Sequence, residues 1–392
     1  MSEVLDSLCT AIVDCEHKTA PEGDGFAYSV GTKAMKDGRI VLDACKPVSA
    51  ETYDGWTRRL RPEPGDLILA REAPVGQVVR VPAAPLVCLG QRTVLIRPDK
   101  SKVHPRFLHY WLLGPAAQHV MNSQAAGATV PHLNVADIRA LDVSEIPGDP
   151  EQQSVTATLL GALDDLIENN RRRVELLQEM AKGIYQEWFV HFRYPGHDDA
   201  AFVDSPRGLI PEGWEVLTLG GVLELRYGKA LKKGDRRGGP VAVLGSSGVV
   251  GWHDEELVPG PAVVVGRKGN VGSVMWVDGG SWPIDTTYFV STDLPLRYVV
   301  EQLRRTEFLN THAAVPGLSR DQAYSRPFLK PPRHLMDEFS AVAEILATEA
   351  SLIGSTSERL AVTRDLLLPK LVTGQIDVSS LDLDAAIEAS VA

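Results

Sequence analysis

The residues that most clearly suggest chemistry form a basic run between positions 226 and 237. It holds one acidic side chain, Asp235, and six basic ones: Arg226, Lys229, Lys232, Lys233, Arg236 and Arg237. A polyanion responds to such a local patch, so the run favours a nucleic-acid partner although the net charge of the chain is −11. On charge alone, a solvated surface loop remains the alternative.

Motifs for catalysis are missing. No GxxxxGK[ST] phosphate loop occurs, and the glycine spacing of residues 266–272 does not fit a dinucleotide fingerprint. The pair Pro331-Pro332 lacks the polar and aromatic neighbours of an adenine or cytosine methyltransferase motif, and residues 245–248 are not a nucleophile elbow. We predict no catalytic residue, while a nuclease or methyltransferase with an unrecognised site stays open as an alternative.

Metal-binding and membrane signals are weak. The four cysteines, Cys9, Cys15, Cys45 and Cys88, show no CxxC pairing and no partner histidine at ligand spacing. We expect reduced thiols in a cytoplasmic protein with no metal site, and a zinc site is the weaker alternative. No run of 18 apolar residues occurs, so we expect no membrane partner.

Two long helices organise the chain. In the first, Asp149-Pro150 is a start signal, and the seam positions that follow alternate spacings of three and four, as in a coiled coil. The seam residues are Leu160, Leu163, Ile167, Asn170, Val174, Leu177 and Ile184; the small Ala181 fills the position between the last two, and Trp188 continues the spacing. In the second helix, residues spaced by seven, Leu346, Ile353, Leu360 and Leu367, repeat this seam at an offset of 186. Tyr194-Pro195-Gly196 and Pro369 are expected to end or bend the helices, and Gly374 can close the last turn.

The segments before each helix also echo one another. Pro64-Gly65 and the run from Arg71 to Val78 recur as Pro259-Gly260 and the run from Arg267 to Val274. Both segments predict short strands at 66–70, 78–81, 93–96, 262–265, 273–277 and 288–290, and helices at 105–113 and 296–309. We therefore predict an α+β fold in which two duplicated α/β domains are separated by two long antiparallel coiled-coil helices.

The predicted boundaries follow from this repeat. They are 1–148 for the first domain, 149–194 for the central helix, 195–333 for a linker and the second domain, 334–374 for the second helix, and 375–392 for a loosely ordered acidic tail.

With this repeat in hand, the chain resembles the specificity (S) subunits of type I restriction-modification systems. The first helix resembles the family's central conserved region in Glu151-Gln152-Gln153, Ala162-Leu163-Asp164-Asp165 and Asn170-Arg171-Arg172. The second helix resembles its C-terminal conserved region from Arg364-Asp365 to Lys370-Leu371. Ile210-Pro211-Glu212-Gly213-Trp214 is similar to the start of a second target-recognition domain.

The resemblance implies a non-catalytic subunit of a type I endonuclease and adenine-N6 methyltransferase complex. It would read a bipartite site in double-stranded DNA, one half-site per domain, and recruit two methyltransferase (M) subunits and restriction (R) subunits through its helices. This chain would bind no cofactor, whereas the partner subunits would use S-adenosylmethionine, ATP and Mg. A scaffold that binds only proteins is the remaining alternative.

Under this interpretation, loops of both domains should face DNA, because base reading needs donors and acceptors held in a groove while phosphate contacts only position the protein. In the second domain we expect phosphate contacts from Lys229, Lys232, Lys233, Arg236 and Arg237, and groove-facing roles for Ser246, Ser247, Arg267, Lys268 and Asn270. In the first domain the candidates are Arg71, Gln91, Arg92, His132 and Asn134. For Arg71 and Arg267 the alternative to DNA contact is a structural role, in which the arginine stabilises the fold.

The helix from Gln152 to Trp188 would be roughly 55 Å long at 1.5 Å per residue. At 3.4 Å per base pair this limits the half-site separation to about 16 base pairs. Packing of the helix ends should shorten it to about one DNA turn, or roughly 10 base pairs. We therefore predict a fixed spacer between the half-sites.

Overall fold

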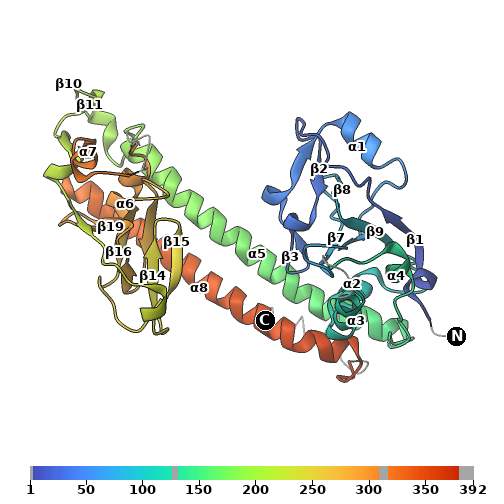
Figure 1. The fold of residues 1–392 in the computed structure, drawn as a ribbon. Coiled ribbons are helices and arrows are strands. Elements are labelled where there is room, and N and C mark those ends of the chain that lie inside the picture. The colour runs from blue at the N-terminus through green and yellow to red at the C-terminus, as the bar shows by residue number, and fades with distance from the viewer. Residues whose placement is uncertain (1–2, 126–130, 309–316, 379–392) are drawn as a thin grey trace. The chain divides into compact units, whose positions relative to one another are not determined.

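The computed structural model describes residues 3–125, 131–308 and 317–378. The chain forms two compact units, Met1–Asn169 with Thr356–Ala392 and Asn170–Ser355. Each long helix, α5 (Pro150–Phe189) and α8 (Arg333–Val372), contributes one part to each unit (Figure 1). The predicted fold class, two α/β domains with two long antiparallel helices, is confirmed.

The first unit contains two sheets. Strands β1 (Cys9–Asp14), β9 (Thr93–Pro98), β6 (Leu67–Ala70) and β7 (Val78–Arg80) form an antiparallel sheet in that order. In the second sheet, β2 (Ala27–Val30) pairs antiparallel with β5 (Lys46–Val48) and parallel with β8 (Val87–Leu89). A short hairpin joins β3 (Met35–Lys36) and β4 (Arg39–Ile40). The helices are α1 (Ala50–Trp56), α2 (Pro105–Leu113), α3 (Pro115–Ala125) and α4 (Val135–Arg139).

Strand β6 is buried on both faces because side chains alternate along a strand. Leu67 and Leu69 enter a core with Phe107 of α2, whereas Ile68 and Ala70 enter a second core on the other face. The first core also takes in Leu160 of α5 and the end of α8, including Leu371. The first part of α5 and the last part of α8 therefore belong to the packed core of the first unit.

The second unit repeats the two main sheets of the first. Its four-stranded sheet has the order β13 (Glu224–Tyr227), β19 (Thr287–Ser291), β16 (Ala262–Gly266) and β17 (Val274–Val277). In its three-stranded sheet, β14 (Val241–Gly245) pairs antiparallel with β15 (Gly248–His253) and parallel with β18 (Ser281–Pro283). Helix α6 (Leu296–Arg304) stands where α2 stands in the first unit, and α7 (Arg320–Tyr324) where α4 stands. The two halves of the repeated sequence thus form sheets with the same strand order.

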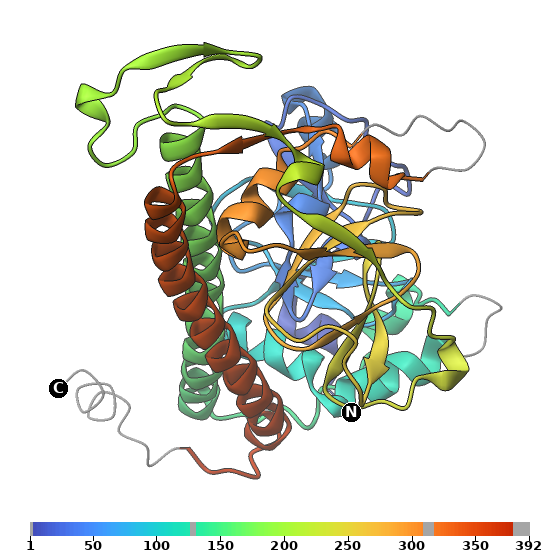
Figure 2. The same ribbon diagram turned by 90° about the vertical axis from the view of Figure 1, so that its left-hand side faces the viewer.

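The second unit also has two strand pairs that sequence patterns did not predict. Strand β10 (Phe202–Ser205) forms a hairpin with β11 (Gly208–Pro211), and β12 (Glu215–Thr218) pairs with β20 (Pro327–Lys330). Figure 2 shows the hairpin beside the end of α5.

Within each unit the parts of α5 and α8 run side by side and antiparallel (Figures 1 and 2). In the first unit Asp164 of α5 pairs with Arg364 of α8 at 2.8 Å. In the second, Arg173 lies 3.8 Å from Glu349, and the rings of Tyr185 and Phe339 are 5.6 Å apart. Of the eleven seam residues, Leu160, Asn170 and Ile353 are buried and the other eight are half-buried.

The helix ends differ in detail from the sequence pattern. Asp149 accepts a hydrogen bond from the backbone N–H of Glu151, as expected of a helix start. Helix α5 ends at Phe189, earlier than the Tyr194-Pro195-Gly196 signal, and Pro369 lies inside α8, which continues to Val372. Gly374 has the left-handed conformation that closes a helix. Helix α6 ends at Arg304, while position 309 and positions 379–392 of the predicted acidic tail lie outside the described residues.

No helix in the part of the chain that the structure describes is both long enough and apolar enough to cross a bilayer.

Candidate nucleic-acid interface

The five candidates of the first domain meet at one end of its four-stranded sheet. Arg71 follows β6 and Arg92 precedes β9, and the backbone N–H of Arg71 donates to the carbonyl of Arg92 at 2.8 Å. The backbone N–H of Leu133, between His132 and Asn134, donates to the carbonyl of Arg71 at 3.0 Å. Residues distant in the sequence are therefore assembled into one edge.

Arg71 is engaged in holding this edge together. It is only 8% exposed, and one guanidinium nitrogen binds both carboxylate oxygens of Asp14 at 2.8 and 2.9 Å. Its Nε donates to the carbonyl of Leu133 at 2.8 Å. The geometry favours the alternative in which Arg71 holds the fold, because its donors are directed at protein acceptors.

The other four candidates lie nearer the surface. Arg92 pairs with Glu72 at 3.1 Å, and the amide of Gln91 donates to the carbonyl of His17 at 3.2 Å. His132 Nε2 lies 3.0 Å from Asn134 Oδ1. Gln91, Arg92 and Asn134 are exposed and His132 is half-buried, so these side chains can present donors and acceptors to a ligand. Their contact with DNA stays a prediction.

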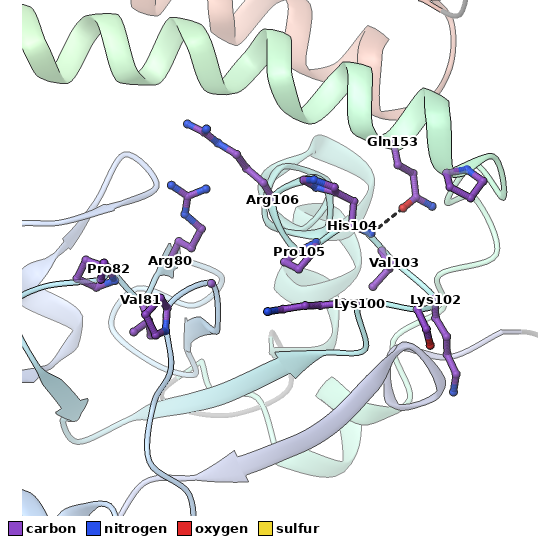
Figure 3. A pocket seen from close by; sticks show the side chains of 15 residues that line it. Arg80, Val81, Pro82, Lys100, Lys102, Val103, His104, Pro105, Arg106 and Gln153 are labelled. Atoms are coloured by element: carbon purple, nitrogen blue, oxygen red, sulfur yellow. Dashed lines mark hydrogen bonds between the residues drawn. The ribbon is translucent and has the colours of Figure 1, made fainter.

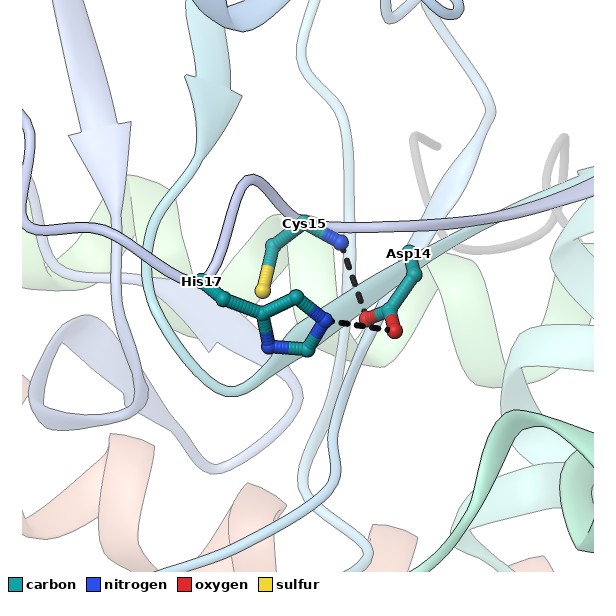
Figure 4. A group of neighbouring side chains, drawn as sticks. All are labelled: Asp14, Cys15 and His17. Carbon is teal, nitrogen blue, oxygen red and sulfur yellow. Dashed lines mark hydrogen bonds and ion pairs between the residues drawn. The ribbon is translucent and has the colours of Figure 1, made fainter.

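One group of three ligand-type side chains lies at the same edge (Figure 4). Asp14, Cys15 and His17 place one ligand atom each within 4.8 Å of one another. The carboxylate of Asp14 is already bound by Arg71 and by His17 Nε2, the latter at 2.9 Å. A cation here would compete with a fixed guanidinium charge, so the group is better described as an ion-pair network than as a metal centre.

The second unit repeats the edge with different side chains. The backbone N–H of Leu318 donates to the carbonyl of Arg267 at 2.8 Å, as Leu133 does to Arg71. Among the residues that the structure describes, no carboxylate pairs with Arg267 as Asp14 pairs with Arg71. Its guanidinium lies 4.9 Å from the ring centre of Tyr227, and it donates to the carbonyl of Asp285 at 3.0 Å. Arg267 is thus less buried than Arg71 and more open to a ligand.

Two residues at this edge were not among the candidates. Tyr227 is 48% exposed, and a second guanidinium, that of Arg320, lies 4.6 Å from its ring centre. Burial raises the pKa of the neighbouring Tyr288 to about 12, so its hydroxyl stays neutral. A tyrosine between two arginines combines stacking area with positive charge, which suits a nucleic acid. The sequence repeats Leu133 as Leu318, with a proline two positions before each, and this repeat points to the segment that carries Arg320.

The loops beside Arg267 are ordered by Ser246. Its Oγ accepts from the backbone N–H of Asn270 at 3.3 Å, and its carbonyl accepts from Ser273 Oγ at 2.7 Å. Ser246 is 8% exposed and therefore positions the loop, whereas Ser247, Lys268 and Asn270 are exposed. Their base contacts remain a prediction.

The basic run at 226–237 divides into two kinds of side chain. Arg236 donates to the carbonyls of Val250 and Leu231, and Arg237 pairs with both Asp254 and Glu255 at 2.8 Å. Lys229, Lys232 and Lys233 are exposed, and no carboxylate in the described part of the chain lies within ion-pair distance of them. These three lysines are the cations most available for phosphates.

Comparison with known proteins finds similar sequences and a solved structure of similar fold. No protein-family model matches the chain. The MjaIX type I restriction enzyme specificity subunit of Methanocaldococcus jannaschii is 29% identical over 165 residues, 42% of this chain and 37% of that protein. The MjaVIII specificity subunit of the same organism is 24% identical over 297 residues, 67% of this chain and 68% of that protein.

A crystal structure of a type I restriction-modification S subunit from M. genitalium has the same fold. Its TM-score is 0.59 at 17% identity, over 95% of this chain and 96% of that one. The fold thus defines a two-domain α+β protein with paired long helices. The resemblance to type I specificity subunits is confirmed by these relatives, although the match spans little more than a third of the MjaIX subunit's length.

Proposed function

We propose that the chain is the DNA sequence-specificity subunit of a type I restriction-modification complex. It reads a bipartite site in double-stranded DNA, with one half-site for each domain. The observation that carries this proposal is the repeated edge, at which Leu133 closes on Arg71 and Leu318 closes on Arg267 with the same backbone contact. Two edges with one backbone and different side chains are suited to reading two different sequences.

The long helices provide surfaces for partner proteins. Several large apolar side chains on them are strongly exposed, and clustered exposed apolar surface marks an interaction site. In the first unit these are Leu166, Val362 and Leu366, and in the second Leu176, Met180 and Ile345. We assign one surface in each unit to one methyltransferase subunit, which gives two M subunits per chain, with restriction subunits joining the full complex.

The chemistry belongs to the partners in this proposal. S-adenosylmethionine is used by the methyltransferase subunits, and ATP and Mg by the restriction subunits, whereas this chain binds none of them and has no catalytic role. Purified chain that methylated or cleaved DNA without partners would contradict this division and favour the enzyme alternative.

The test is exchange of one domain. Replacing residues 1–148 by the first domain of another specificity subunit, and mapping methylated adenines in a host that carries the partner methyltransferase, should change one half-site and leave the other intact. The matched control exchanges residues 195–333 and should change the opposite half-site. Unchanged methylation in both exchanges would refute the proposal, and assembly with partners without DNA binding would favour the protein scaffold.

The helices set the spacer in this proposal. Inserting one heptad into each helix lengthens it by about 10.5 Å, or about 3 base pairs. The mapped spacer should therefore grow by about 3 base pairs. An unchanged spacer in an active variant would refute the role of the helices as a ruler.

A further inference from the structure

A cavity of about 690 Å³ opens in the first unit, at the end of the four-stranded sheet where β6 begins and β7 ends (Figure 3). Gly65, Arg80 and Lys100 line it from the sheet side, and His104 and Arg106 line it from the start of α2. This is the opposite end of the sheet from Arg71 and Arg92, since β6 runs from Leu67 to Ala70 and β9 from Thr93 to Pro98. The cavity is thus separate from the candidate DNA edge.

The polar lining of the cavity is basic. Arg80, Lys100, Lys102 and Arg106 border it, and no acidic side chain is among its lining residues in the part of the chain that the structure describes. Lys102 donates to the carbonyl of Ser7 and lies 3.8 Å from the carboxylate of Asp99, and Arg106 pairs with Asp165 at 2.7 Å. These two side chains are already partly neutralised.

Arg80 and Lys100 are the cations left over. Within the described residues, neither has an ion-pair or hydrogen-bond partner for its side chain. Figure 3 shows the Arg80 and Arg106 side chains extending toward α5, and Lys100 extending toward Val81. Burial lowers the pKa of the Arg80 guanidinium and the neighbouring charge of Arg106 lowers it further, and the more weakly felt charges of Asp165 and Asp164 offset this only in part. An anion at this point would relieve both effects.

His104 adds a neutral donor. Its Nδ1 accepts from the backbone N–H of Phe107 at 3.4 Å, which leaves the ring proton on Nε2. Burial, with the charges of Arg106 and Arg80, lowers the pKa of His104 and keeps the ring neutral. Its backbone N–H donates to Gln153 Oε1 at 2.8 Å, so the residue is fixed in place by α5.

Much of the remaining lining is apolar, including Pro64, Val81, Pro82 and Pro105, and Ser101 and Gln153 add neutral polar groups. Apolar walls with a few polar groups, in a volume of this order, are typical of small-molecule sites. Two unpaired cations match the roughly two negative charges of a phosphate monoester, and guanidinium groups suit phosphate oxygens.

From these observations we propose that the cavity beside Arg80 is a binding site for a small phosphorylated ligand of the mononucleotide class. Arg80 and Lys100 hold the phosphate, Arg106 and His104 assist, and the proline-rich wall packs against the face of the base. The site does not depend on the proposed DNA-reading function, because it lies away from the residues assigned to DNA.

Calorimetric titration of the full chain with AMP, inorganic phosphate and adenosine tests the proposal. We expect AMP to bind with one molecule per chain, phosphate to bind more weakly, and adenosine to bind weakest. Arg80→Gln and Lys100→Gln should each weaken AMP binding about tenfold or more, as loss of a charged hydrogen bond does. The matched control is Lys33→Gln, an exposed lysine outside the cavity, which should leave binding unchanged.

No AMP binding at millimolar concentration, or binding that Arg80→Gln leaves intact, would overturn the proposal. A parallel DNA-binding measurement distinguishes the two sources of phosphate, a small ligand and the DNA backbone. If Arg80→Gln reduces the salt dependence of DNA binding while AMP does not bind, the cations serve the DNA backbone and the small-ligand site is refuted. Loss of DNA binding on changing lysines of the second unit bears only on the proposed DNA function, so the two failures are distinguishable.

Discussion

Replacing Arg364 by alanine should loosen the last turns of α8 from the first domain. The guanidinium of Arg364 pairs with Asp164 of α5 at 2.8 Å, and Asp164 also accepts from the hydroxyl of Tyr110 on α2 at 2.6 Å. Three helices that are distant in the sequence therefore meet at one carboxylate. Burial, followed by the charge of Asp164, raises the pKa of Tyr110, which keeps its hydroxyl a donor.

The size of the effect follows from burial. The side chains of Arg364 and Asp164 are 15% and 29% exposed, so solvent screens the pair only in part. A hydrogen bond to a charged group contributes about 1.5–3 kcal/mol, and exposure of Asp164 places the pair near about 2 kcal/mol. Arg359→Ala is the matched control, because Arg359 is exposed and should cost less than about 0.5 kcal/mol.

Hydrogen exchange of the peptide covering residues 360–372 measures the opening of this segment directly. A double-mutant cycle with Arg364→Ala and Asp164→Asn should give a coupling free energy of about 2 kcal/mol, with the faster exchange confined to the first unit. A coupling below about 0.5 kcal/mol, no larger than the cost expected for Arg359→Ala alone, would show that the pair is solvated and that the reasoning from burial is wrong.

Three further perturbations test other parts of the structure. His109 is buried, and burial is the main cause that lowers its pKa to about 3. Below about pH 6.5 the histidine of the unfolded chain is therefore protonated, whereas that of the folded chain stays neutral. Stability should fall by about 2 kcal/mol from pH 7 to pH 5, and His109→Leu should remove this part of the dependence in urea titrations. Phe339→Ala removes a ring that is 1% exposed and should destabilise the second unit by about 3–5 kcal/mol in thermal unfolding, with exposed Val342→Ala as control. Lys232→Gln with Lys233→Gln should flatten the salt dependence of DNA binding by nearly two units of log-log slope; Arg237→Gln, whose charge Asp254 already balances, should change it less.

Much of the architecture was predictable because it follows from the spacing of apolar residues along the sequence. Strands 67–70 and 262–266 are continuous apolar runs, as strands buried on both faces must be. Helix α2 begins and ends at the predicted residues, since His104-Pro105 starts it and Gly114 follows it. The duplicated seam likewise locates both long helices.

Other elements depend on contacts that no local pattern records. Strands β5, β2 and β8 are short and pair across long sequence distances, so their sheet was not predicted. Helix α8 passes through Pro369, a residue that usually ends a helix, and the turn beyond it packs into the first core through Leu371 and Val372. Tertiary packing outweighs the local preference at this point.

At the candidate interface, the sequence could locate the loops but not the state of each side chain. The echo of Arg71 by Arg267 is real in the backbone, yet Asp14 binds one arginine while two tyrosines receive the other. Likewise, the carboxylates of Asp254 and Glu255 lie outside the basic run but balance its last arginine. Charge within a short window therefore overestimates the number of cations available to a ligand.

The core of the first unit joins residues near position 5 with residues near position 378. On the ribosome, the leading part of the chain must wait for nearly two hundred further residues before Leu368, Leu371 and Val378 can close its apolar face. At about 5–20 residues per second this delay is roughly 10 to 40 s. The second unit, which is continuous in sequence from Asn170 to Ser355, can finish first, so the nascent protein should mature from its middle outward and its amino-terminal half should be the natural client of chaperones.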